Sequence, residues 1–137
     1  SKSDPSDMSR INLTDDADTI MQKVKKAKTD PEPLPSDEAG LEGRAEAANL
    51  VGIYAAVAGT DTAGVLRDFG GEGFGKFKPA LGELLVEKLS PINARFVELR
   101  QDREALDAIL AKGALKARDM ARPTLDATYK ALGLVRG

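Results

Sequence analysis

The first residues of the chain carry groups that could act on a phosphate. Ser1, Lys2 and Ser3 supply two hydroxyl groups and one positive charge within a polar stretch that also holds Asp4. A loop of this kind could close over a triphosphate and neutralise the charge that develops on it during a reaction. Many ordinary polar loops have the same composition, so the residues by themselves leave both interpretations open.

Positive charge is concentrated in two further places. Residues 1–72 carry a net charge of −6, whereas residues 91–137 carry a net charge of +3. A basic C-terminal third suits a polyanionic partner, although an ordinary solvated helix surface has the same composition. The second place is a cluster of four lysines that either match the negative end of a helix dipole or face a phosphate chain. They are Lys23, Lys25, Lys26 and Lys28.

Composition excludes several kinds of chemistry. The chain has no cysteine and no histidine, so it holds no disulfide, thiolate metal site or histidine-dependent triad. No loop has the ligand spacing of a calcium or magnesium site, so we expect no metal site. The glycine-rich stretch at 70–75 follows no strand, which indicates a turn between helices and not a phosphate-binding loop. No apolar run reaches the roughly 20 residues of a membrane span, and the cytoplasm is the simplest location.

The elements that must position these residues are predicted to be helical. Large apolar residues recur at steps of three and four from Phe74 to Leu99, which predicts a long amphipathic helix around which the others pack. Pro91 lies inside this helix, so we expect a kink or a break near Ser90. No run of residues alternates as a strand would. The predicted class is therefore all-α, with about five to six helices in a bundle.

Caps and glycine stops indicate the other helices. Thr14 precedes three acids and could cap a helix that starts at 15. A helix over 45–58 is apolar on most sides and should be buried, and a short helix covers 61–69. The last helix covers 102–132, and Gly113 could divide it. Its predicted inner face consists of Leu106, Ile109, Leu110, Leu115, Ala117, Met120, Ala121, Leu125 and Leu132.

Two segments are predicted to lie outside the helices. Residues 1–14 are polar and show no periodicity, so they indicate a loop. Residues 29–43 contain three prolines and five acids, which predict an exposed connector or flexible loop between helices.

Several segments, in their order and spacing, resemble one family over nearly the whole chain. S-K-S-D-P at 1–5 is similar to the end of the K-M-S-K-S signature loop of class I aminoacyl-tRNA synthetases. The remainder of the chain resembles the bacterial tryptophanyl-tRNA synthetases. The segments that carry this resemblance are D-D-A-D-T-I at 15–20, K-V-K-K-A-K-T-D at 23–30, N-L-V-G-I-Y at 49–54, F-G-K-F-K at 74–78, L-S-P-I-N-A-R-F-V-E-L at 89–99, L-D-A-I-L-A-K-G-A-L-K-A-R at 106–118 and T-L-D-A-T-Y-K-A-L-G-L at 124–134.

The resemblance implies the C-terminal part of an enzyme that activates tryptophan with ATP and Mg²⁺ and transfers it to tRNA-Trp. Residues 1–14 would be the end of the signature loop, a remnant of the catalytic domain, and residues 15–137 the helical region that receives the anticodon end of the tRNA. Ser1, Lys2 and Ser3 match the last three signature positions and would bind ATP, with Lys2 also catalytic. The first lysine and the methionine of the signature are absent. The family's nucleotide-binding fold and tryptophan pocket, which orient the reactants, are absent as well, so the chain by itself is expected to be inactive and to hold no cofactor.

The resemblance also implies partners for the chain. They are tRNA-Trp, the missing N-terminal catalytic domain and a second subunit, since the family works as a homodimer, and exposed helix faces could make the isolated chain self-associate. Other interpretations are a free-standing helical RNA-binding or protein-interaction module and a purely structural bundle. The candidate tRNA-binding residues, chosen by charge and region, are Arg95, Arg100, Arg103, Lys112, Lys116, Arg118 and Arg122.

Overall fold

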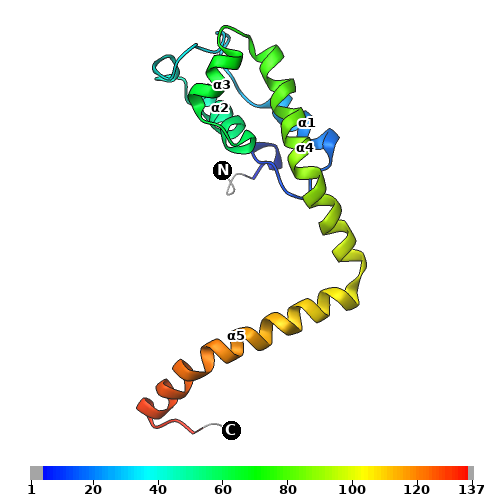
Figure 1. Ribbon diagram of the computed structural model, residues 1–137, viewed down its shortest axis with the longest axis vertical. Helices are drawn as coiled ribbons and strands as arrows, with labels where there is room; N and C mark the ends of the chain where they lie inside the picture. Colours follow the sequence, from blue (N-terminus) through cyan, green and yellow to red (C-terminus); the bar gives the residue numbers. More distant parts are fainter. Residues whose placement is uncertain (1–4, 136–137) are drawn as a thin grey trace. The chain divides into compact units, whose positions relative to one another are not determined.

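The computed structural model describes residues 5–135, and the regular structure within them is entirely helical (Figure 1). The predicted all-α class is confirmed. The chain divides into two compact units, Ser1–Arg95 and Phe96–Gly137. Over residues 5–135, no helix combines the length and the apolar character needed to cross a membrane. The elements are η1 (Asp7–Ser9), α1 (Ala17–Lys26), η2 (Ala39–Leu41), α2 (Ala45–Ala58), α3 (Thr62–Phe69), α4 (Phe74–Gln101) and α5 (Arg103–Leu132).

Aspartates and a glycine set the ends of these helices. Asp16 caps α1 by accepting a hydrogen bond of 2.8 Å from the backbone N–H of Thr19, so the predicted cap at Thr14 is wrong by two residues. Asp16 is the N-cap in place of Thr14 because its carboxylate reaches the free N–H groups of the first turn and its negative charge matches the helix dipole. The predicted stop of α2 is confirmed at Gly59, whose φ of 71° is a left-handed conformation that glycine adopts without strain.

The first half of α4 is the centre of the core of the first unit. Phe77 and Leu81 are fully buried and Leu85 is 4% exposed. The ring of Phe77 lies 5.6 Å from that of Tyr54 on α2 and 5.2 Å from that of Phe69 on α3, measured between centroids. These contacts confirm that α4 supplies the surface against which α2 and α3 pack (Figure 1).

On another side of the core, α1 approaches α4 closely. A Cβ atom at Gly82 would lie 2.5 Å from the sulfur of Met21, so a larger residue there would require the Met21 side chain to move. Ile20 and Val24 complete the apolar face of α1 and are almost fully buried. Four helices of this unit therefore share one core.

Most of the proline-rich segment 29–43 is exposed, as its composition predicts, but the segment is anchored to the core and is not a free connector. Leu34 is only 2% exposed, and its backbone N–H donates to the carbonyl of Glu72 at 2.9 Å. The N–H of Gly71 donates to the Leu34 carbonyl at 2.8 Å. The prolines prevent a helix here, but the chain is held by burial of Leu34 and by these long-range hydrogen bonds.

α4 runs without a break through Ser90 and Pro91, so the interruption allowed for by the sequence is not present. Proline removes one backbone donor, and the carbonyl of Glu87 that loses its partner belongs to an exposed residue where water can replace the bond. Beyond the proline, Ile92 is 46% and Phe96 is 39% exposed. The apolar spacing continues there, but burial does not.

In the second unit, α5 is a single helix that neither Gly113 nor Pro123 divides. None of its residues is buried, so the predicted inner face is exposed; Leu110 and Met120, for example, are 60% and 72% exposed. The spacing correctly indicated an apolar side of a helix, but not whether that side is buried.

Candidate functional site

The residues with the strongest sequence signal, Ser1, Lys2 and Ser3, lie outside the described residues. The described chain next to them begins with an anchored segment. Ser6 caps η1 by accepting a hydrogen bond from the N–H of Met8 at 3.3 Å. This segment leads directly into a polar network around α1.

The network is centred on Lys23, whose side chain is 3% exposed. Its Nζ donates to Oδ2 of Asp7 and to Oδ2 of Asp15, both at 2.7 Å. Asn12 joins the two carboxylates, because its backbone N–H donates to Asp15 and its side-chain amide donates to Asp7, each at 2.8 Å. The network ties residues 7–15 to α1, so it fixes the chain next to the signature residues.

The charged groups in this network shift each other's pKa values. Burial works against the charged form of Lys23, but the hydrogen bonds that it donates to Asp15 and Asp7 more than offset this effect and raise the pKa of Lys23. The hydrogen bond from Lys23, followed by that from Asn12, lowers the pKa of Asp7. Both shifts favour the ion pair.

The lowered pKa of Asp7 predicts a loss of stability in acid. A carboxylate whose pKa is lowered in the folded state stabilises the fold at pH values above its unfolded-state pKa of about 3.9. This stabilisation is lost as the pH falls through the folded-state pKa. Asp30 behaves alike, because the Arg44 side chain lowers its pKa. We therefore expect the urea concentration at the unfolding midpoint to decrease as the pH is lowered below about 4.

The variant Lys23→Met separates the contribution of Asp7 to this pH dependence. It removes the partner of Asp7, so the urea midpoint should depend less steeply on pH below about 4 than in the unaltered chain. Lys88→Met is the matched control, since Lys88 is an exposed lysine that pairs with the neighbouring Glu87 at 2.8 Å. Parallel pH profiles for Lys23→Met and the unaltered chain would contradict the assignment.

The four lysines predicted as a cluster lie in three different places. Lys23 belongs to the buried network, and Lys25 lines a cleft against α4. Lys26 and Lys28 line a separate hollow beside η1, where Lys28 pairs with Glu46 at 3.1 Å. Because successive helical residues point about 100° apart, the four do not form a single surface for a phosphate chain.

The candidate tRNA-binding residues are all exposed, as a contact with nucleic acid requires. Arg95 and Arg100 lie on α4, and the other five candidates lie on α5. Lys112 and Lys116 are four residues apart and share a side of α5, as do Arg118 and Arg122 on another side. The structure therefore places these cations on more than one face of α5.

Arg100 has an additional feature. Its guanidinium lies 5.8 Å from the centre of the Phe96 ring, and this ring is 39% exposed. A guanidinium held over an exposed aromatic ring presents a flat surface on which an unpaired base can stack. Among residues 5–135, no three acidic side chains come together as a metal site would require.

Two ion pairs were missed in the sequence, that of the buried Lys23 and that of Arg44 with Asp30, which is partly buried. Lys23 follows Ile20 by three residues, so its place on the apolar face of α1 was a signal that it would be buried and paired. Arg44 donates to Asp30 at 2.6 Å and 3.0 Å and to the carbonyls of Glu32 and Pro33. The acids of the preceding segment indicated that a partner for Arg44 was available, but not which acid it would be.

Comparison with curated proteins gives relatives over almost the whole chain. A tryptophan–tRNA ligase from Caulobacter vibrioides is 62% identical over 97% of this chain, and one from Mesorhizobium japonicum is 55% identical over all of it. A ligase of the same name from Rickettsia felis is 43% identical over 98%. The chain spans 39–40% of the length of these three relatives. No family model matches the chain.

The helical fold, the exposed cations and these similarities place the chain among ligases that are named for a tRNA. Within that class its sequence is similar to the tryptophan–tRNA ligases, and it matches about two fifths of their length, 39% for the ligase from Caulobacter vibrioides. The resemblance seen in the sequence segments is confirmed.

Proposed function

We propose that the chain is the C-terminal part of a ligase that activates tryptophan with ATP and esterifies it onto tRNA-Trp. The observation that carries this proposal is 62% identity, over 97% of the chain, to a protein named tryptophan–tRNA ligase. Because the chain spans 39% of that relative's length, groups that bind tryptophan would belong to the remaining part. We therefore expect the chain alone not to catalyse, since it does not orient the reactants.

The phosphates of ATP are assigned to the signature residues. Ser1 and Ser3 would donate hydrogen bonds to phosphate oxygens, and Lys2 would neutralise the negative charge that develops on them as the adenylate forms. Mg²⁺ would accompany the triphosphate and neutralise part of its charge. The similarity in sequence supports these assignments, and no step is assigned to a described side chain.

The helical region is assigned to the anticodon end of tRNA-Trp. Exposed arginines and lysines on α4 and α5 supply flexible cations for phosphate groups. Arg100 over Phe96 supplies a flat surface suited to an unpaired base. Both kinds of contact are needed where a protein binds a single-stranded RNA loop.

We also propose that the complete ligase is a homodimer in the cytoplasm. The exposed apolar side of α5, which includes Leu110 and Met120, supports a large contact with the rest of the ligase or with a second copy. In the isolated chain the same side would favour self-association.

Charge reversal tests the tRNA-binding assignment. We expect Arg95→Glu, Arg100→Glu and Arg118→Glu each to weaken binding of a tRNA-Trp transcript in a filter assay, because each loses a phosphate contact. The slope of log affinity against log salt should fall by roughly 0.7–0.9 per contact. Lys88→Glu is the control, since Lys88 lies on α4 outside the candidate set. Affinities that match the control would remove the residue concerned from the binding surface.

A further inference from the structure

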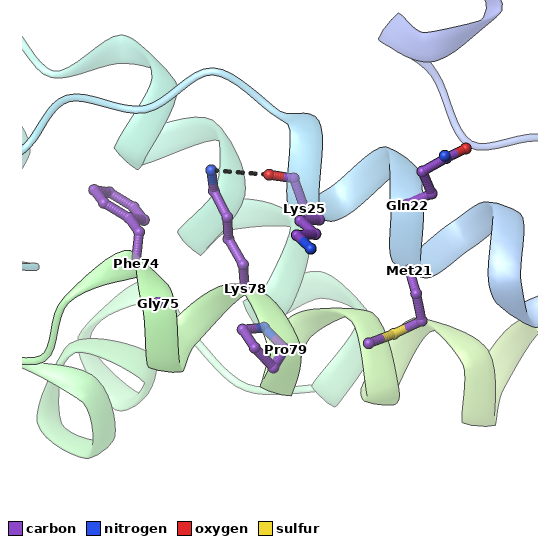
Figure 2. Close-up of a pocket in the computed structure, with 7 residues that line it drawn as sticks. All are labelled: Met21, Gln22, Lys25, Phe74, Gly75, Lys78 and Pro79. Atoms are coloured by element: carbon purple, nitrogen blue, oxygen red, sulfur yellow. Dashed lines mark hydrogen bonds between the residues drawn. The ribbon is translucent and has the colours of Figure 1, made fainter.

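A cleft in the first unit lies where α1 meets the start of α4. It has a volume of about 650 Å³, within the usual range for small-ligand sites. Figure 2 shows Phe74, Lys78 and Pro79 on α4, with Met21 and Lys25 on α1. None of the functional assignments above uses these side chains.

The electrostatics of the cleft suit an anion. Lys25 is exposed at its rim, and among the described residues no carboxylate lines it. Nζ of Lys78 donates to the carbonyl of Ala27 at 2.6 Å. It also donates to the carbonyl of Lys25 at 3.5 Å, the bond drawn in Figure 2. Lys78 thus offsets the negative end of the α1 dipole, which would otherwise repel an anion. α4 begins at Phe74, so the positive end of its dipole also lies at the cleft.

The remaining wall of the cleft is apolar. Met21, Phe74 and Pro79 line it, and the Phe74 ring lies 5.9 Å from Nζ of Lys78. Phe74 belongs to the core and is only 9% exposed, so the accessible apolar surface is mainly that of Met21 and Pro79. An apolar surface beside two ammonium groups matches a ligand in which a ring and a phosphate are joined. A nucleotide has this combination, and proteins hold single-stranded nucleic acid with cations beside a surface for the bases.

We propose that this cleft binds one unpaired nucleotide of an RNA strand. Its base lies on the apolar wall, and its phosphate contacts Lys25 and the remaining N–H of Lys78. The proposal rests on the tRNA-binding function above and adds to it a contact on the first unit, separate from the cations of α5. It also accounts for Lys25, which the ion pairs of α1 do not use.

Charge reversal at the rim tests the phosphate contact. Binding of a fluorescent single-stranded RNA oligonucleotide to the 137-residue chain is measured by anisotropy. We expect Lys25→Glu to weaken it roughly tenfold, because a phosphate contact is replaced by repulsion. Lys88→Glu reverses the same charge on an exposed part of α4 and should change it less than about twofold. Equal losses in the two variants, or no binding by the unaltered chain, would overturn the proposal.

Filling the cleft tests the base contact without changing charge. A Cβ atom at Gly75 meets no atom within 4 Å, and Gly75 lies in α4, so Gly75→Leu should fold normally and raise the melting temperature slightly. We expect it to weaken oligonucleotide binding by about as much as Lys25→Glu. Binding that is unchanged in a normally folded Gly75→Leu chain would overturn the proposal.

Two further arms separate the sources of the ligand and the two RNA-binding proposals. In a competition experiment, AMP is added at the same concentration as the oligonucleotide. Displacement of the oligonucleotide by AMP would identify a free nucleotide as the ligand and overturn the RNA assignment. If Lys25→Glu leaves tRNA-Trp binding unchanged while Arg100→Glu and Arg118→Glu weaken it, the cleft proposal fails and the α5 surface stands. If only Lys25→Glu weakens it, the cleft stands and the α5 assignment fails.

Discussion

Phe77→Ala is expected to lower the free energy of unfolding of the first unit by about 3–5 kcal/mol. The side chain is fully buried, and its ring contacts those of Tyr54, Phe69 and Phe74. Alanine removes these contacts together with the apolar area, and leaves a cavity that rigid neighbouring rings cannot close. A domain of this size has about 5–15 kcal/mol of stability in total, so the variant should be close to unfolding.

Urea unfolding followed by circular dichroism measures the effect, with Phe96→Ala as the matched control. Phe96 is the same residue type on the same helix but is 39% exposed, so its truncation should cost no more than about 0.5 kcal/mol. Similar losses for the two variants would show that the core is not centred on the first half of α4. A larger loss for Phe96→Ala would show that the second half is buried in solution, for example by self-association.

The contrast between Phe77 and Phe96 shows what periodicity can predict. Both residues follow the same spacing along α4, and the helix itself was predicted from it. Spacing shows that one side of a helix is apolar, but not whether another element covers it. α1, α2 and α3 cover the first half. The same argument applies to α5, whose apolar side was predicted correctly and whose burial was not.

Tertiary placement also decided what could be predicted of the polar residues. Lys23 was grouped with its neighbours as lysines that match a helix dipole or face a phosphate chain, but its pairing with Asp7 depends on where the chain sixteen residues earlier lies against α1. Leu34 was placed in an exposed loop because prolines dominate its surroundings, whereas its partners Gly71 and Glu72 come from a distant turn. Local composition shows that a segment is not helical, but not what it packs against.

The signature residues depend on a different kind of information. Nothing in the composition of Ser1, Lys2 and Ser3 distinguishes them from an ordinary polar loop. Their significance comes from the resemblance of the segments after them in the chain, which the 62% identity to a tryptophan–tRNA ligase now supports. For the cations of α5, the resemblance indicated a tRNA-binding region but no individual contact. The role of each of these residues in tRNA binding therefore stays a prediction.

Lys2→Ala in the complete ligase is expected to slow adenylate formation roughly 10²–10³-fold, the usual cost of losing one group that stabilises developing charge. Tryptophan binding should change little, because Lys2 is assigned to the phosphates of ATP. Single-turnover kinetics and tryptophan-dependent ATP–pyrophosphate exchange measure the rate, and equilibrium titration measures tryptophan binding. Lys2→Arg should recover part of the rate, since it restores the positive charge.

Lys28→Ala is the matched control for this experiment. Lys28 is an exposed lysine whose side chain pairs with Glu46 at 3.1 Å, so its loss removes one surface ion pair and should leave the rate of adenylate formation unchanged. Equal losses of rate and of tryptophan affinity in Lys2→Ala would instead make Lys2 a residue that maintains the structure of the site. A slow step that Lys2→Arg does not recover at all would mean that the shape of the lysine, and not its charge, is required. A charge-stabilising role requires both a selective loss of rate and its partial recovery by arginine.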